Sequence, residues 1–246
     1  MKIVVIGGTG LIGSTVVARL GEHGHQAVPA APSTGVDTIT GEGLKEVLQG
    51  ADVLVDVSNS PSFADDDVMA FFRTATGNLV DAAEEAGVGH YVALSVVGSE
   101  RLPESGYLRA KVAQEALIED AGLPYTIVRA TQFFEFAGGI ADTATTDGVV
   151  RLPSGGVQPV AAAEVAAAVG RAAAGAPVGG TIEIGGPEVF GLDEWVRTVL
   201  AARSDAREVV SDPRARYFGT LLEKDSLLPG PGAQVAETRL AEWLAR

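Results

Sequence analysis

Six short apolar runs alternate with longer helical stretches along the chain, and this alternation constrains the fold more than any other feature. Most of the runs are apolar almost throughout, which is typical of parallel strands covered on both faces. They occupy residues 2–8, 25–31, 51–57, 90–97, 125–130 and 180–186. Helices are predicted near residues 11–22, 42–49, 65–86, 107–121, 162–174, 192–203 and 235–245. Because crossovers of this length join parallel strands, the sequence predicts the α/β class with a doubly wound parallel sheet.

The alternation loosens after about residue 130. Residues 147–160 and 211–232 are predicted to be loops or short helices. In doubly wound folds such segments lie over the carboxyl ends of the strands, where ligands bind. We therefore expect one domain over residues 1–246, in which segments after about residue 130 form a small C-terminal substrate-binding portion.

Composition excludes several kinds of site. The 246 residues include no cysteine, which excludes disulfides, thiolate metal ligands and cysteine nucleophiles. Acidic residues outnumber basic residues by 32 to 18, and the net charge of −14 repels phosphate backbones, so we expect no nucleic-acid partner. The three histidines have no carboxylate cluster around them, and we expect no metal site.

The apolar runs are too short for a membrane protein. None approaches the roughly 18 to 20 residues that a membrane span requires. Met1 leads straight into the first run without a signal-like leader. We therefore expect a cytoplasmic protein that acts on a small-molecule substrate, with no membrane partner, as a monomer or a homodimer.

A glycine-rich turn follows the first apolar run and opens the first predicted helix. In "GGTGLIGS" (7–14) the glycines have G-x-x-G-x-x-G spacing. The first two permit a tight turn close to a pyrophosphate, the third lets the helix pack on the sheet, and the helix N-terminus faces the phosphate charge. A nucleoside-triphosphate loop is disfavoured, because Ser14 stands where that loop needs its lysine. The predicted dinucleotide-binding residues of this turn are Gly7, Thr9, Gly10, Leu11, Ile12 and Gly13.

The identity of the dinucleotide depends on the end of the second apolar run. NAD is commonly held there by an Asp or Glu that binds the ribose diol. This chain has "VPAAPSTG" (28–35) instead, with neither a carboxylate nor an arginine. Ser33 and Thr34 could donate hydrogen bonds to a 2′-phosphate, so we expect NADP(H) to be favoured over NAD(H). A polar turn without a ligand role is the alternative.

A tyrosine and a lysine four residues apart begin the helix predicted at 107–121. Tyr107 and Lys111 share one helix face, so the ammonium can lie near the phenol. A neighbouring cation favours the phenolate and is expected to lower the Tyr107 pKa towards a value useful for proton transfer. Ser95, at the end of the preceding apolar run, could hydrogen-bond a substrate carbonyl. Alone, Ser95 would be only a strand-end hydroxyl, but together the three side chains are predicted to be catalytic.

The chain resembles the short-chain dehydrogenase/reductase superfamily, and more closely its atypical NmrA-like branch. The resemblance covers the whole chain and rests on "GGTGLIG" (7–13), "DVSNS" (56–60), "TGNLVDAAEEAGV" (76–88), "LSVVG" (94–98), "YLRAK" (107–111) and "IVRATQFFEF" (127–136). It implies a Rossmann-like NAD(P)-binding domain with Ser95, Tyr107 and Lys111 as catalytic residues. In this resemblance Lys111 also holds the nicotinamide ribose.

The resemblance implies further residues around the cofactor. Asn78 resembles the helix asparagine that supports a proton-relay water in many members, and an asparagine at a helix interface is the alternative. The adenosine half would pass beside Val57, Ser58 and Asn59. The nicotinamide would be bordered by Ala130, Thr131, Gln132 and Phe133.

Phenylalanines cluster just past the fifth apolar run. Phe133, Phe134 and Phe136 lie within four positions, so they cannot all point the same way. We expect at least one of them to form an apolar wall of the substrate cleft, with Phe63 facing the same cleft. A place in the core is the alternative for each. The predicted substrate-contacting residues are Phe63, Phe133 and Phe134.

Two functions follow from these residues. Retention of the serine, tyrosine and lysine predicts an NADP(H)-dependent reductase that transfers hydride to a small carbonyl or quinone-like substrate, with Tyr107 as general acid. NmrA-like members often lack the tyrosine and serve as dinucleotide-binding regulators. A non-catalytic NADP(H)-binding redox sensor is therefore the alternative.

Overall fold

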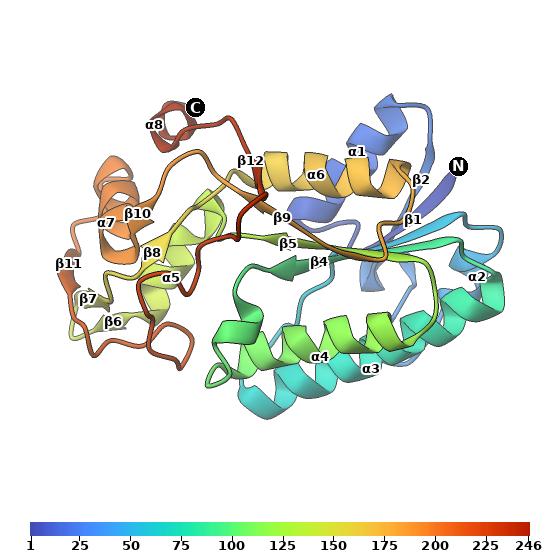
Figure 1. The fold of residues 1–246 in the computed structure, drawn as a ribbon, viewed down its shortest axis with the longest axis horizontal. Helices are drawn as coiled ribbons and strands as arrows, with labels where there is room; N and C mark the ends of the chain where they lie inside the picture. The colour runs from blue at the N-terminus through green and yellow to red at the C-terminus, as the bar shows by residue number, and fades with distance from the viewer.

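The computed structural model describes residues 1–246, and its centre is a parallel sheet of seven strands (Figure 1). The strand order is β12-β9-β5-β4-β3-β1-β2. The strands are β1 (Lys2–Ile6), β2 (Gln26–Ala30), β3 (Val53–Asp56), β4 (His90–Val96), β5 (Tyr125–Ala130), β9 (Gly180–Gly185) and β12 (Gln234–Val235). All but β12 fall on the predicted apolar runs, and the predicted Rossmann-like, doubly wound α/β class is confirmed.

The central strands are mostly apolar because both of their faces are buried. In β1, Ile3 and Val5 point into one hydrophobic cluster, and Val4 and Ile6 point into another on the opposite face. None of these four side chains is more than 2% exposed. Alternate residues of a strand face opposite sides of the sheet, so a strand covered on both sides shows no polar alternation.

Helices form a layer on each face of the sheet (Figure 1). One layer contains α1 (Leu11–Glu22) and α6 (Ala162–Ala174), and the other contains α2 (Leu44–Leu48), α3 (Asp65–Ala86) and α4 (Gly106–Asp120). The helix α3 ends at Gly87, whose φ of +67° is left-handed, as expected of a glycine that stops a helix. None of the helices has both the length and the apolar character required to cross a membrane.

Two helices are shorter than the sequence predicts. The helix α2 begins only after Gly43, whose φ of +74° lies outside the helical region. The helix α8 (Leu240–Leu244) was expected to begin at 235, but Val235 belongs to β12. The backbone N–H groups of Glu237 and Thr238 then donate to the Glu164 carboxylate, at 2.7 and 3.2 Å. These tertiary contacts keep residues 234–238 out of the helix.

Several of the segments after β5 build a smaller portion beyond the carboxyl ends of β4 and β5, at the left of Figure 1, whereas α6, β9 and β12 belong to the central sheet and its helix layer. The smaller portion has its own hydrophobic core, in which the Trp195 side chain is fully buried. Its helices are the short 3₁₀ helix η3 (Phe134–Phe136), α5 (Ala137–Thr143) and α7 (Leu192–Ala202). A three-stranded sheet has the order β11-β7-β6, with β11 (Glu208–Ser211), β7 (Val149–Leu152) and β6 (Thr145–Thr146).

The prediction of loops or short helices over 147–160 misses two short strands. This segment holds β7 and β8 (Gly156–Val157), and β8 pairs antiparallel with β10 (Phe190–Gly191). The strand β7 pairs in parallel with β11, more than fifty residues further along the chain. Strands this short are stabilised by partners distant in sequence, so their local pattern does not reveal them. Residues 212–232 are irregular apart from turns and isolated bridges, in agreement with the prediction of loops.

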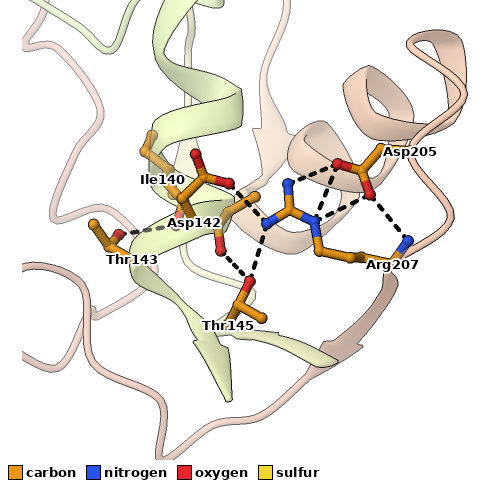
Figure 2. Close-up of polar contacts among 7 residues, drawn as sticks. Ile140, Asp142, Thr143, Thr145, Asp205 and Arg207 are labelled. Carbon is orange, nitrogen blue, oxygen red and sulfur yellow. Dashed lines mark hydrogen bonds and ion pairs between the residues drawn. The ribbon is translucent and has the colours of Figure 1, made fainter. Parts of the chain in front are cut away.

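Arg207 connects segments of this C-terminal portion that lie far apart in the sequence (Figure 2). The Arg207 guanidinium donates to both carboxylate oxygens of Asp205, with its shortest bond at 2.7 Å from Nη2 to Oδ2. Its Nη1 donates to Asp142 Oδ1 at 2.8 Å and to Thr145 Oγ1 at 3.1 Å. The start of β11 is thereby tied to the end of α5 and the start of β6.

We expect Arg207→Gln to lower the melting temperature by a few degrees, because glutamine cannot make the forked bonds to Asp205 and still reach Asp142. Thermal unfolding followed by circular dichroism measures this. Arg214→Gln is the matched control, because Arg214 is exposed and its only ion pair, with Asp212, is 3.8 Å long. Equal melting temperatures for the two variants would show that the Arg207 contacts do not stabilise this portion.

Candidate cofactor and active site

The glycine turn is built by close backbone contacts. Gly7 follows β1 with a left-handed φ of +75°, and a Cβ atom there would lie 3.0 Å from Ser58 N and from Val57 C. A Cβ atom at Gly13 would overlap the Gly7 carbonyl oxygen and lie 2.8 Å from Gly8 Cα. The first turn of α1 therefore rests directly on the loop that precedes it, and the loop rests on the end of β3.

The N-terminus of α1 is open to a ligand. Gly10 caps the helix without any side-chain hydrogen bond, and no acidic residue lies in the first turn. Thr9, Gly10 and Leu11 are exposed. Because the first N–H groups of a helix have no intrahelical acceptor, those of Leu11, Ile12 and Gly13 can donate to an anion. This site fits a pyrophosphate, as the glycine spacing predicted.

At the end of β2, one of the two hydroxyls predicted to bind a 2′-phosphate is already hydrogen-bonded within the protein. Thr34 Oγ1 accepts from Ala31 N and donates to Ala31 O, both at 2.9 Å, so this hydroxyl is used within the 3₁₀ helix η1 (Pro32–Thr34). Ser33 remains exposed. Beside Thr34 lies an open hollow of about 620 Å³ that also contains Glu42 and Glu46, two carboxylates that sequence analysis did not consider.

The end of β3 is a polar junction. Asp56 is 1% exposed, and its Oδ1 accepts from Ser58 N at 3.0 Å and from Ser58 Oγ at 2.6 Å. The Ser58 hydroxyl therefore turns inward, away from any adenosine. Val57 lies under the glycine turn, and Asn59 is exposed with its Oδ1 accepting from Ser60 N. Of the three residues predicted beside the adenosine half, the side chain of Asn59 is the most accessible.

Lys111 belongs to a buried chain of polar groups. It is 3% exposed, and its Nζ donates to Leu94 O at 2.8 Å and to Gln114 Oε1. Gln114 Nε2 in turn donates to Asp56 Oδ2 at 2.8 Å. Burial lowers the pKa of Lys111 to about 8, and the Asp56 and Glu115 carboxylates oppose this lowering. Sequence analysis missed Asp56 and Gln114, although the acid at the strand end and the glutamine three residues after Lys111 were available signals.

The expected lowering of the Tyr107 pKa is wrong. Burial raises the pKa of Tyr107 to about 12. The Tyr107 ring packs against Phe63 at 5.4 Å, Phe218 at 5.9 Å and Phe72 at 6.3 Å between ring centroids. Lys111 shares the helix face, but its ammonium points to Leu94 and Gln114. Desolvation by the rings therefore determines the state of the phenol.

Ser95 lies where the sequence placed it, at the end of β4. The Lys111 bond to the neighbouring Leu94 carbonyl brings α4 against this end of the strand. Ser95 is 3% exposed, and its Oγ has no hydrogen-bond partner. Buried hydroxyls nearly always have a partner, so this one is available to a bound group.

Asn78 is not brought to this cluster. Its Nδ2 donates to Thr38 O at 2.8 Å and to Ile39 O at 3.0 Å, which ties α3 to the loop before α2. These contacts support the alternative of an asparagine at an interface, and they use the N–H donors of the amide.

The residues after β5 are buried. Ala130, Thr131, Gln132 and Phe133 are each at most 9% exposed. Thr131 Oγ1 donates to Gln158 O at 2.6 Å, whereas both polar atoms of the Gln132 amide lack a hydrogen-bond partner. The amide nevertheless lies close enough to the Tyr217 hydroxyl to oppose the rise that burial causes in the pKa of that hydroxyl, so Gln132 and Tyr217 form a buried polar pair.

Two of the predicted substrate-contacting phenylalanines are core residues. Phe134 is 1% exposed and packs on Trp243, at 5.4 Å between centroids, in the core of the C-terminal portion. Phe133 belongs to the core on the α1 and α6 side of the sheet and stacks on Phe136. Because the 3₁₀ helix η3 begins at Phe134, the two adjacent rings point in different directions. Phe133 enters the core on the α1 and α6 side of the sheet, and Phe134 enters the core of the C-terminal portion. Phe63 is 52% exposed and contacts Tyr107, so it is the one predicted wall residue found at the site.

The site also contains two aromatic residues that sequence analysis missed. Tyr217 and Phe218 come from the irregular segment after β11, and Phe218 contacts both Phe63 and Tyr107. Their "YFG" sequence in a loop was the available signal, but nothing in it shows where the loop lies. No three His, Asp or Glu side chains gather as a set of metal ligands.

Comparisons with known proteins identify a family and several relatives. Residues 7–174 match the family described as NAD(P)H-binding. The chain is 31% identical, over 188 residues, to the (4-alkanoyl-5-oxo-2,5-dihydrofuran-3-yl)methyl phosphate reductase of Streptomyces griseus; the match covers 68% of this chain and 63% of that protein. The chain spans between 40% and 50% of the length of the other curated relatives it matches.

Solved structures share the fold. MoeE5 in complex with UDP-glucose and NAD superposes with a TM-score of 0.74 at 18% identity, over 100% of this chain and 96% of that one. The NADPH-dependent quinone oxidoreductase QOR2 of Escherichia coli superposes with a TM-score of 0.67 at 22% identity, over 91% and 80% of the two chains. Likeness at this level of identity concerns the fold.

Proposed function

Because the chain belongs to the NAD(P)H-binding family, we propose that it is an NADP(H)-dependent reductase that transfers hydride to a small carbonyl or quinone-like substrate, with Tyr107 as general acid. One observation carries the proposal. The chain combines an open helix N-terminus after Gly10 with a half-buried Tyr107, packed among aromatic rings, whose phenol has its pKa raised to about 12. The first binds phosphate charge, and the second keeps its proton at neutral pH and can donate it.

Reduction of a carbonyl needs a hydride at carbon and a proton at oxygen. The bound dinucleotide supplies the hydride. Tyr107 donates its phenolic proton to the carbonyl oxygen, and the partnerless Ser95 hydroxyl donates a hydrogen bond to the same oxygen. The buried Lys111 ammonium, fixed by Leu94 and Gln114 one helical turn after Tyr107, would hold the nicotinamide ribose. Water then restores the phenol's proton.

The relatives support a reductase without specifying its substrate. The Streptomyces griseus relative is a reductase, although its match covers only part of each protein. The likeness to QOR2 is at the level of fold and is our reason for testing quinones. The short-chain dehydrogenase/reductase class and its NmrA-like branch stay predictions, because the matching family is described only as NAD(P)H-binding.

The test has two parts on the purified protein. Calorimetric titration measures the Kd values of NADPH and NADH. Loss of NADPH absorbance then measures turnover on a panel of quinones, diketones and aldehydes. We expect tight NADPH binding and turnover of at least one class. Binding of NADPH without turnover of any compound would overturn the reductase and favour the redox sensor.

We further expect NADPH to bind more tightly than NADH, because residues 31–35, which follow β2 directly, include no carboxylate to repel a 2′-phosphate. Ser33→Asp adds such a charge at an exposed position and should weaken NADPH binding about tenfold with little change for NADH. Ser33→Asn is the neutral control of the same size. If the unmodified protein prefers NADH, the assignment of NADP(H) is wrong and Glu42 and Glu46 become the residues to examine.

A further inference from the structure

A buried glutamine lies between the Lys111 ammonium and the Asp56 carboxylate. Gln114 is 1% exposed, and its Oε1 accepts from Lys111 Nζ while its Nε2 donates to Asp56 Oδ2 at 2.8 Å. An ammonium can only donate and a carboxylate can only accept, so these two partners determine which way round the amide lies. Gln114 therefore makes the surroundings of Lys111 depend on Asp56.

The Asp56 carboxylate is held by donors from three elements. Its Oδ1 accepts from Ser58 N at 3.0 Å and from Ser58 Oγ at 2.6 Å, in the loop after β3. Its Oδ2 accepts from Gln114 Nε2 on α4 and, at 3.4 Å, from Tyr91 Oη on β4. Four donors meet one carboxylate that is 1% exposed, so its orientation is fixed.

The other groups around the Lys111 ammonium leave Asp56 as its negative partner. The Phe72 ring of α3 lies on one side, with Nζ 4.4 Å from its centroid. The Glu115 carboxylate is also near, but it accepts forked bonds from Arg129, at 2.9 and 2.6 Å, whereas Asp56 takes part in no ion pair. Burial lowers the pKa of Lys111 to about 8, and Asp56 opposes this lowering more than Glu115 does.

One donor of the Lys111 ammonium remains for a ligand. An ammonium has three N–H donors, and the Leu94 carbonyl oxygen, at 2.8 Å, and Gln114 Oε1 accept from two of them. The third N–H has no acceptor in the protein, so a ribose hydroxyl can accept from it. The first two contacts hold the ammonium in place for that bond, and one of the two depends on the orientation of the Gln114 amide.

We propose that Asp56 and Gln114 are positioning residues: the Asp56 carboxylate orients the Gln114 amide so that its oxygen holds the Lys111 ammonium in place. The same carboxylate accepts from Ser58 N, which lies under the glycine turn, 3.0 Å from where a Cβ atom of Gly7 would be. One buried acid therefore holds both the backbone below the pyrophosphate site and the lysine for the nicotinamide ribose. The contact of Lys111 with that ribose rests on the proposed function, whereas the position and charge of Lys111 do not.

Asp56→Asn should disturb the Lys111 ammonium without touching it. The new amide can keep its oxygen toward Ser58, but its nitrogen then faces Gln114 Nε2, and two donors cannot pair. Turning the Gln114 amide over restores that bond and brings Nε2 to the ammonium in place of Oε1. Lys111 then loses both an acceptor and a nearby negative charge, so we expect its pKa to fall, with a titration midpoint lower by about one pH unit or more.

NMR can follow the Lys111 titration directly, because the chain has only four lysines, Lys2, Lys45, Lys111 and Lys224. Lysine labelled with ¹³C at Cε gives a signal for each, and Lys111→Met identifies the signal of Lys111. The exposed Lys45 and Lys224 are internal references whose midpoints should not change. Calorimetry on the same samples at pH 8 measures the Kd of NADP⁺, which we expect to rise about threefold or more in Asp56→Asn, because a charged donor binds more strongly than a neutral one.

Gln114→Met tests whether the amide transmits the effect. Methionine has a similar length but no comparable acceptor for Lys111, so the midpoint of Lys111 should fall in this variant as well. In the Gln114→Met background, Asp56→Asn should lower the midpoint by less than it does alone, because no amide remains to be turned over. Asp193→Asn is the matched control for loss of a buried carboxylate. Asp193 is 8% exposed and pairs with Arg197 in the C-terminal portion, so this variant should leave the Lys111 midpoint unchanged even where its melting temperature falls.

A Lys111 midpoint that stays unchanged in Asp56→Asn or Gln114→Met, or that falls equally in Asp193→Asn, would overturn the positioning role. Equal effects of Asp56→Asn in both backgrounds would overturn the part of Gln114, since charge alone would then account for the change. Gln114→Met decides by itself if Asp56→Asn does not fold. Failure of the proposed function has a different signature. The Lys111 midpoint would respond as expected, but Lys111→Met would bind NADP⁺ as tightly as the unmodified protein, or NADPH would reduce no compound of the panel.

Discussion

Tyr107→Phe is expected to lower kcat for NADPH-dependent reduction by about 10²- to 10⁴-fold, the usual contribution of a positioned acid. The variant removes only the phenolic oxygen, so the ring still packs against Phe63, Phe72 and Phe218. NADPH affinity and melting temperature should therefore stay close to those of the unmodified protein. Steady-state kinetics and calorimetry on the two proteins measure both quantities.

The pH profile separates Tyr107 from Lys111. A phenol with a pKa of about 12 stays protonated throughout the range in which the protein can be assayed, so its titration should not appear in that range. Lys111, with a pKa of about 8, loses its charge as the pH rises through that value. A decline in kcat above about pH 8 would thus report on the lysine, and we expect it to persist in the residual activity of Tyr107→Phe.

Tyr125→Phe is the matched control for the tyrosine substitution. Tyr125 begins β5, at the end of the sheet opposite to the proposed site, and should leave kcat unchanged. Should Tyr107→Phe retain most of its turnover, the proton must come from elsewhere, and the Ser95 hydroxyl would be the next residue to test. The fold and the cofactor site would not be affected by that result.

The central fold could be predicted because its signals are local. Six strands appear as apolar runs, since burial on both faces leaves mainly apolar residues in β1, β3 and β4, with the polar residues at or near the strand ends. Gly7 and Gly13 could also be identified by spacing, because their close backbone contacts involve residues within the same turn or at the next strand's end. The glycine spacing can be recognised without knowing that the end of β3 lies under Gly7.

The errors have one physical cause. Pairing of β7 with β11 and packing of Phe218 on Tyr107 both join segments more than fifty residues apart. The pKa of Tyr107 follows from that packing, because the rings that desolvate it come from other segments. The helical spacing of Tyr107 and Lys111 correctly predicts a shared face, but it does not reveal that Gln114 and Leu94 hold the ammonium. Sequence analysis thus identified the candidate residues and misjudged their electrostatics.

The second large effect is expected at the glycine turn. A Cβ atom at Gly13 would overlap the Gly7 carbonyl oxygen and lie 2.7 Å from the Gly7 carbonyl carbon, and neither backbone atom can rotate away. In Gly13→Ala the helix α1 must therefore move off the turn, which displaces the N–H groups proposed to hold the pyrophosphate. We expect NADPH binding to weaken by about 100-fold or more and the melting temperature to fall, since overpacking costs about 1–3 kcal/mol.

Gly21→Ala separates this effect from a general effect of alanine in α1. Gly21 belongs to the same helix, and a Cβ atom there would meet nothing within 4 Å. Alanine should stabilise the helix at this position by about 0.5–1 kcal/mol and leave NADPH affinity unchanged. Calorimetry and thermal unfolding on both variants give the comparison. If Gly13→Ala unfolds at a lower temperature but binds NADPH as tightly as Gly21→Ala does, the turn is a packing element and the dinucleotide phosphates must bind elsewhere.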